Sequence, residues 1–89
     1  MKMIKFKTYS DAGHGWIAVK RKLLIELKID KEITRFSYQK GGTVYLEEDC
    51  DATTLIEKLK ELSIDYILVQ GKYQNYSTIR SYQSYTFKG

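Results

Sequence analysis

Hydrophobic and polar residues alternate with a period of two over several short stretches of the chain. In residues 1–9, Ile4 and Phe6 are separated by polar residues, which predicts a strand with both side chains turned inward and lysines that protect an exposed edge. β-Branched and aromatic residues predict further strands. These strands cover residues 16–19, 33–38, 43–46 and 64–70. The Gly41-Gly42 pair predicts a tight hairpin between residues 33–38 and 43–46, because glycine adopts positive φ without steric cost.

Two other stretches have the spacing of amphipathic helices. In residues 20–28, three leucines fall on one side and the basic residues on the other. In residues 51–62, leucine and isoleucine recur at helical spacing, and Asp51 is expected to cap the first turn, with Thr53 or Thr54 as alternatives. The predicted order is therefore β-β-α-β-β-α-β, in one α+β domain covering residues 1–89. We expect a small antiparallel or mixed sheet with both helices on one face.

The C-terminal segment is rich in tyrosine and polar residues, and its pattern is compatible with two structures. A short helix around residues 78–85 would place Ile79, Tyr82 and Tyr85 on one face, whereas an extended arm would align Arg80, Tyr82 and Ser84. We therefore predict either a tyrosine-rich C-terminal arm or a short helix.

Composition narrows the class of protein without naming a function. The net charge of +4 is mild, so it permits an anionic partner without requiring one. One cysteine cannot form an internal disulfide, there is no apolar run near membrane-spanning length, and residues 1–9 are too polar for a signal peptide. We expect a cytoplasmic protein that does not enter a membrane and that needs no cofactor. Because so short a chain buries a limited core, homo-oligomers are also expected.

The segment from Ser10 to Trp16 is the most distinctive local sequence. Gly13 and Gly15 flank His14, the only histidine, and precede Trp16, the only tryptophan. The glycine N–H groups are candidate hydrogen-bond donors to an anion. The imidazole is a candidate hydrogen-bonding group, and the indole is a candidate stacking surface. The alternative is a tight turn with the indole in the core. Catalysis by His14 would need a partner within hydrogen-bonding reach.

An acidic cluster spans residues 47–51 and contains the single cysteine, Cys50. Its carboxylates, Glu47, Asp49 and Asp51 among them, are compatible with a divalent cation, but the spacing matches no calcium loop. Cys50 at a helix N-terminus would be a nucleophile if its pKa were lowered there. We favour the alternative of helix capping, solvated charge and a small buried thiol, so we assign no metal site and no catalytic residue.

Basic and aromatic residues outside the helices form a second candidate set. Cations bind phosphate and aromatic rings stack on bases, which is the usual chemistry of nucleotide recognition. The same tyrosines are typical of protein–protein interfaces. The ligand-binding candidates from this set are Arg35, Tyr38, Lys40, Arg80 and Tyr82, with Lys72, Tyr73, Tyr76 and Tyr85 as neighbours.

Four motifs together resemble a family of short, uncharacterised proteins carried by phages, plasmids and other mobile elements. They are residues 11–16 (DAGHGW), 36–39 (FSYQ), 45–52 (YLEEDCDA) and 79–82 (IRSY), and the resemblance extends from about Tyr9 to Tyr85. Members of that family often have proline where this chain has Ala12 and Lys20. The resemblance implies no particular activity.

Small phage proteins without catalytic motifs often inhibit host defence, and this analogy gives our leading expectation. It is a non-enzymatic anti-defence protein, a sponge that sequesters a nucleotide-type signal in a basic, aromatic pocket formed by two or more chains. One alternative is an inhibitor, such as an anti-CRISPR protein, that binds a host protein directly. A small nucleic-acid-binding accessory protein is another. A hydrolase that uses His14 with the acidic cluster is the enzymatic alternative.

Overall fold

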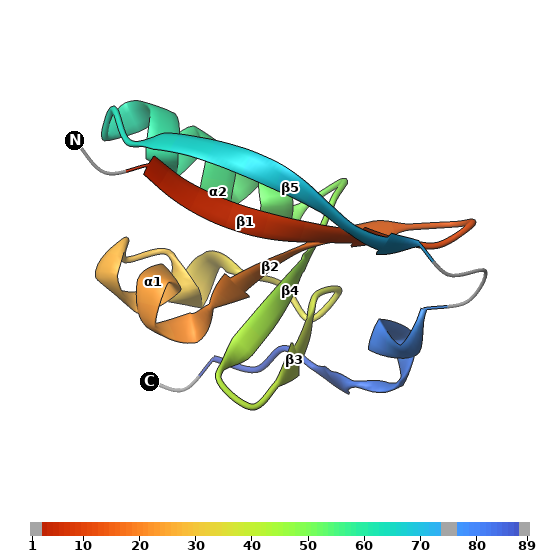
Figure 1. Ribbon diagram of the computed structural model, residues 1–89. Helices are drawn as coiled ribbons and strands as arrows, with labels where there is room; N and C mark the ends of the chain where they lie inside the picture. Colours follow the sequence, from red (N-terminus) through yellow and green to blue (C-terminus); the bar gives the residue numbers. More distant parts are fainter. Residues whose placement is uncertain (1–2, 74–76, 88–89) are drawn as a thin grey trace.

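The computed structural model describes residues 3–73 and 77–87 and has the α+β architecture predicted from the sequence (Figure 1). Its strands, helices and 3₁₀ turns are β1 (Met3–Ser10), β2 (Gly15–Lys20), α1 (Arg21–Glu26), η1 (Asp30–Glu32), β3 (Tyr38–Lys40), β4 (Thr43–Glu47), α2 (Asp51–Glu61), β5 (Asp65–Tyr73), η2 (Thr78–Ser81) and β6 (Gln83–Ser84). The six strands form one mixed sheet in the order β5-β1-β2-β4-β3-β6. β1 pairs parallel to β5, and the other pairings are antiparallel.

One face of the sheet carries the hydrophobic core. Ile17 and Val19 of β2 and Val44 and Leu46 of β4 are buried there, as the period-two pattern requires. Both helices pack on this face, because their leucines belong to the same buried cluster. The buried helix positions are Leu24, Leu55 and Leu59. The predicted placement of two helices on one face is therefore confirmed.

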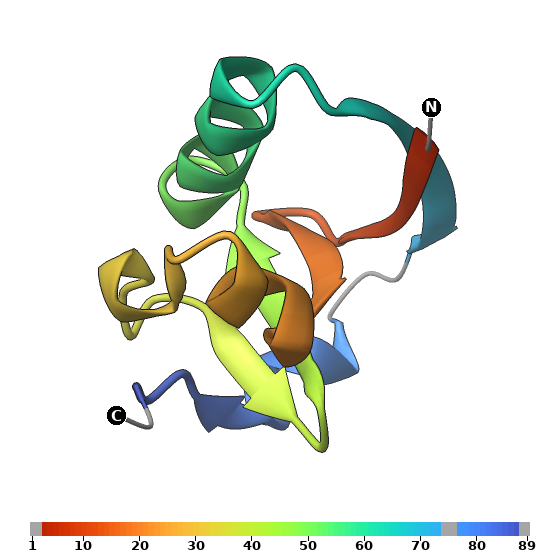
Figure 2. The same cartoon turned by 90° about the vertical axis from the view of Figure 1, so that its left-hand side faces the viewer.

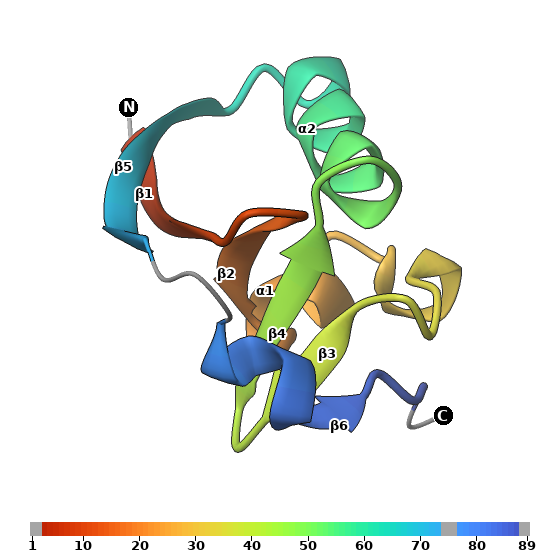
Figure 3. The same cartoon turned by 90° about the vertical axis from the view of Figure 1, so that its right-hand side faces the viewer.

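Part of the opposite face of the sheet is covered by the C-terminal segment. Figures 2 and 3 view the molecule from opposite sides: α1 lies in front of the sheet in Figure 2, and η2 lies in front of it in Figure 3. The segment contains both a short 3₁₀ helix, η2, and a short strand, β6, so each of the two predicted structures is present over part of it. Tyr85 then turns back into the main core and donates a hydrogen bond to the Asp30 carbonyl oxygen at 2.5 Å.

Residues 33–38 are not a continuous strand, so this part of the prediction was wrong. Only Tyr38 belongs to β3, and residues 34–37 form a turn closed by a hydrogen bond from Ser37 N–H to the Thr34 carbonyl. The cause is Asp51, which is buried and accepts hydrogen bonds from the Thr34 N–H, the Thr34 hydroxyl and the Ser37 hydroxyl. The same contacts correct the expected helix cap, since the Asp51 side chain bonds the turn and not the first helical amides.

The Gly-Gly hairpin is present as predicted. Lys40 pairs with Thr43 across the two-residue turn, and Gly41 has a φ of +60°. The lysines of β1 do not protect a sheet edge, which corrects another expectation. β1 lies inside the sheet between β5 and β2, so that Lys5 and Lys7 point outward from an interior strand.

Candidate functional site

The turn between β1 and β2 is built around the carboxylate of Asp11. Its Oδ1 accepts hydrogen bonds from the Gly13 and His14 N–H groups at 3.0 and 2.9 Å, which closes a local turn. The Gly13 amide is thus used inside the protein and is not presented to an anion as expected. Neither Gly13 nor Gly15 has positive φ among the described residues, so glycine is needed there for space. A Cβ at Gly13 would lie 3.0 Å from the Arg80 guanidinium, and one at Gly15 would lie 3.0 Å from the Glu48 carboxyl group.

The same carboxylate joins this turn to the C-terminal segment. Arg80 donates from Nε to Asp11 Oδ2 at 2.6 Å and from its terminal nitrogen to Oδ1 at 2.9 Å, and the Ser77 N–H donates to Oδ2 at 3.0 Å. The hydrogen bonds from Arg80, followed by those from the backbone N–H groups, hold the pKa of Asp11 well below its usual range, against the opposing effect of burial. Two segments separated by 69 residues are therefore held in one place by charge-assisted bonds.

A cavity of about 260 Å³ lies at this junction, and we call it the indole pocket. It is lined by His14, Trp16, Phe36, Tyr38, Glu47 and Arg80. The Arg80 guanidinium lies 5.8 Å from the Trp16 ring centre, and Trp16 packs edge-on against Tyr38 at 6.3 Å. The pocket thus combines aromatic walls with one carboxylate, one guanidinium and one imidazole.

The indole of Trp16 is almost fully enclosed, with 2% of its surface exposed. Its Nε1–H is a buried donor with no hydrogen-bond partner among the described residues. Native proteins leave few such groups unpaired, since each costs about 1–3 kcal/mol. Trp16 therefore forms part of the pocket wall and is not a freely accessible stacking surface.

The charge inside the pocket differs from the cationic site expected from the sequence. Arg80 is compensated by Asp11, while Glu47, with 13% of its side chain exposed, lies with Oε2 3.5 Å from His14 Nδ1. Glu47 Oε1 also accepts a hydrogen bond from the Asp49 N–H at 2.9 Å, so the carboxylate is held in position. Because the Arg80 guanidinium is already paired with Asp11 and Glu47 adds a further carboxylate, the pocket favours a neutral ring with N–H donors over a phosphate group.

The structure brings together only part of the predicted site. His14, Trp16, Tyr38 and Arg80 line one pocket, whereas Gly13, in the turn, and Gly15, the first residue of β2, are not among its lining residues. The other predicted residues lie outside its lining: Arg35 is exposed in the turn before Phe36, and Lys40 lies over the Tyr82 ring at 4.8 Å. The neighbouring residue Tyr76 and the side chains of Lys72 and Tyr73 lie outside the described residues.

Sequence reasoning missed three residues of this site. Phe36 and Glu47 line the pocket, and Asp11 holds it together. Phe36 was hidden by the incorrect strand assignment, and Glu47 by its place in the acidic cluster. The Asp-x-Gly-His pattern at residues 11–14 is a signal for a side-chain-bonded turn and would have pointed to Asp11.

The carboxylates of the acidic cluster do not gather around a common point. Asp51 points inward to Thr34 and Ser37, and among residues 3–73 and 77–87 no three metal-ligating side chains are grouped suitably to hold an ion. In the same residues no helix is both long and apolar enough to cross a bilayer.

Cys50 is exposed but is not activated as a nucleophile. The neighbouring carboxylate of Asp51, and then burial of the thiol group, raise the pKa of Cys50 above its ordinary value. We therefore expect alkylation by iodoacetamide at pH 7.5 to be slower for this thiol than for free cysteine, with the rate still rising above pH 9. A rate faster than that of free cysteine would contradict this description of the acidic cluster.

Comparisons with models of protein families, with curated proteins and with solved structures gave no significant match to this chain. The function of the protein is therefore inferred from the geometry of the site.

Proposed function

We propose that this chain is a non-enzymatic binding protein that holds the base of a nucleotide-type ligand in the indole pocket. The observation that supports this most is the Asp11–Arg80 contact, which joins the Gly-His-Gly-Trp turn to the C-terminal segment. Flat aromatic walls suit a planar ring system. The pocket volume of about 260 Å³ is smaller than the roughly 300–1,000 Å³ of pockets that hold drug-sized ligands. The pocket therefore suits a base and leaves the phosphate outside.

The polar groups favour a base with an N–H donor edge. A guanine presents two adjacent donors, N1–H and N2–H, which the Glu47 carboxylate would accept, and its ring would stack on the exposed Phe36 side chain. The Trp16 Nε1–H is buried and has no hydrogen-bond partner among the described residues, so it would donate to a ligand acceptor if binding moved the pocket wall and exposed it. Guanine nucleotides are thus the preferred class.

The biological role that we propose follows the resemblance to mobile-element proteins. Sequestration of a nucleotide signal inside the bacterial host cell would remove it from the defence system that it activates. The six residues that line the pocket come from several segments of one chain. Homo-oligomers would raise the number of sites per particle.

Calorimetry with GMP, IMP, AMP and guanine-containing cyclic dinucleotides tests the proposal. We expect saturable binding of guanine ligands with Kd below about 100 μM. IMP and AMP should bind about 10-fold or more weakly, because each hydrogen bond lost to a carboxylate costs about 1.5–3 kcal/mol. Phe36→Ala and Glu47→Gln should each weaken binding at least about 10-fold, and Phe87→Ala, which removes another exposed phenylalanine, should not. Equal binding of all the bases, or none, would refute the assignment.

The contact between His14 and Glu47 also favours a second candidate, a nucleotide hydrolase with the histidine as general base. Chromatography of the ligands after prolonged incubation separates the two functions. Our proposal predicts intact nucleotide. Turnover that His14→Ala abolishes would establish the enzyme instead.

Direct binding of a host protein is favoured by a different surface. Ile67, Leu68 and Val69 are each about 40–50% exposed on β5, which is an edge strand. Such an edge can accept a strand from a partner. A host protein retained after nuclease treatment, and lost on Leu68→Lys, would support this function.

A further inference from the structure

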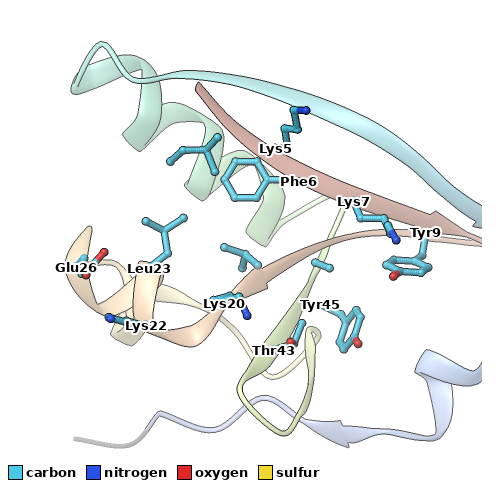
Figure 4. Close-up of a pocket in the computed structure, with 13 residues that line it drawn as sticks. Lys5, Phe6, Lys7, Tyr9, Lys20, Lys22, Leu23, Glu26, Thr43 and Tyr45 are labelled. Atoms are coloured by element: carbon cyan, nitrogen blue, oxygen red, sulfur yellow. The ribbon is translucent and has the colours of Figure 1, made fainter. Parts of the chain in front are cut away.

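A groove on a different part of the molecule is bordered by lysines. It has a volume of about 730 Å³ and its lining includes Lys5, Lys7, Lys20 and Lys22 together with Tyr9 and Tyr45. We call it the lysine groove. Figure 4 shows Tyr9 and Tyr45 at one end of the groove and Glu26 at the other, with the lysines distributed between β1 and the β2–α1 junction. It shares no lining residue with the indole pocket.

The groove exists because β1 separates from β2. β1 pairs with β5 along most of its length from Met3, but it pairs with β2 only from Lys7 to Ser10. In the gap that opens between β1 and α1, Phe6 and Leu23 form the apolar floor (Figure 4). A nonlocal parallel pairing therefore creates a cavity that the local sequence pattern does not indicate.

The register of the sheet aligns cationic and aromatic side chains along this groove. Lys5, Lys7 and Tyr9 alternate on the outward face of β1, and Lys7 lies opposite Ala18 of β2, which lies opposite Tyr45 of β4. The small Ala18 side chain leaves space between the lysine and the tyrosine. Tyr45 is further supported by ring contacts with Tyr9 at 5.9 Å and Tyr82 at 5.3 Å.

The charge of the groove is strongly one-sided. Its four lysines are all exposed, and Glu26 is the only carboxylate in its lining. None of the ion pairs in the described part of the chain involves these lysines. Ammonium groups without internal partners, close to partly exposed tyrosine rings, are the combination that binds single-stranded nucleic acid through its phosphates and bases.

We propose that the lysine groove binds a short segment of single-stranded nucleic acid. The four lysines contact successive phosphates, and one base packs on the partly exposed rings of Tyr9 and Tyr45 at their end of the groove. Duplex DNA fits less well, because its bases are stacked on one another and are not available to the tyrosines. The binding is sequence-tolerant, since no amide or carboxylate side chain in the groove other than Glu26 can read a base edge.

Fluorescence anisotropy with a labelled 12-nucleotide oligothymidylate tests this site. At low salt we expect Lys7→Glu/Lys20→Glu to weaken binding about 10- to 100-fold. The matched control, Lys31→Glu/Lys60→Glu, changes the net charge equally at exposed positions outside the groove and should weaken binding less than about threefold. Circular dichroism confirms that both variants fold. An equal loss in the two variants would show that only the net charge attracts the oligonucleotide, and would overturn the proposal.

Salt and competitor series complete the test. Four phosphate contacts predict a slope of about −2.8 for log affinity against log salt, and neutralising Lys7 and Lys20 with glutamine should make it shallower by about 1.4. Unlabelled duplex DNA and polyglutamate should compete at least about 10-fold more weakly than the single strand. Equal competition by either polymer would refute a site for single-stranded nucleic acid.

Discussion

Replacing Asp51 with alanine is expected to lower the free energy of unfolding by about 3 kcal/mol, a large part of the roughly 5–15 kcal/mol typical of small domains. The carboxylate is 1% exposed and accepts hydrogen bonds from the Thr34 N–H, the Thr34 hydroxyl at 2.8 Å and the Ser37 hydroxyl at 2.5 Å. Without it the buried Ser37 hydroxyl and the partly buried Thr34 donors lose their acceptor. Urea denaturation followed by circular dichroism measures the loss.

The neighbouring Asp49 gives a matched control for this result. Asp49 is an exposed residue two positions away, so Asp49→Ala should change stability by less than about 0.5 kcal/mol. If both substitutions had the same small effect, Asp51 would not organise the turn at residues 34–37. In that case the position of Phe36 in the pocket would also need another explanation.

The second large effect is expected for Arg80→Ala. This change removes the cation that pairs with Asp11 and frees the segment that covers Trp16. Removal of one partner from a pair with a buried carboxylate is costly, so we expect the melting temperature to fall by roughly 10 °C. Because Trp16 is the only tryptophan, its emission should also shift to longer wavelength in the folded variant. Arg35→Ala, at an exposed arginine, should change neither property.

The same pair predicts a dependence of stability on pH. Arg80 holds the pKa of Asp11 below its usual value of about 3.9. A carboxyl group with a lowered pKa in the folded state stabilises the protein fully above its unfolded pKa, and this contribution is lost as the pH falls below about 4. Asp11→Asn should remove this part of the acid dependence. An unchanged acid profile in that variant would contradict the role given to the pair.

Local patterns predicted the helices and the hairpin because their contacts are close in sequence. The spacing of the leucines predicted both helices, and the Gly41-Gly42 pair predicted the turn between β3 and β4. The parallel pairing of β1 with β5 joins distant segments, and the alternation in either strand is compatible with many partners. Residues 33–38 alternate like a strand, yet hydrogen bonds to Asp51, which lies 14 residues beyond Ser37 and 17 beyond Thr34, impose a turn.

The site was predictable in its residue types but not in its electrostatics. His14, Trp16, Tyr38 and Arg80 could be selected because imidazole, rings and guanidinium are ligand-binding groups. Their common location depends on Asp11, and pairing with Asp11 is also what removes the expected excess of positive charge. A single sequence does not reveal which carboxylate meets which arginine across 69 residues.

Nuclear magnetic resonance of the single indole N–H during titration with a guanine nucleotide tests the ligand assignment most sharply. We expect one indole resonance that moves downfield and saturates with the calorimetric Kd, because the ligand would accept a hydrogen bond from the Trp16 Nε1–H, which has no partner among the described residues. An indole resonance that stays in place while the nucleotide binds elsewhere, or while nothing binds, would contradict it.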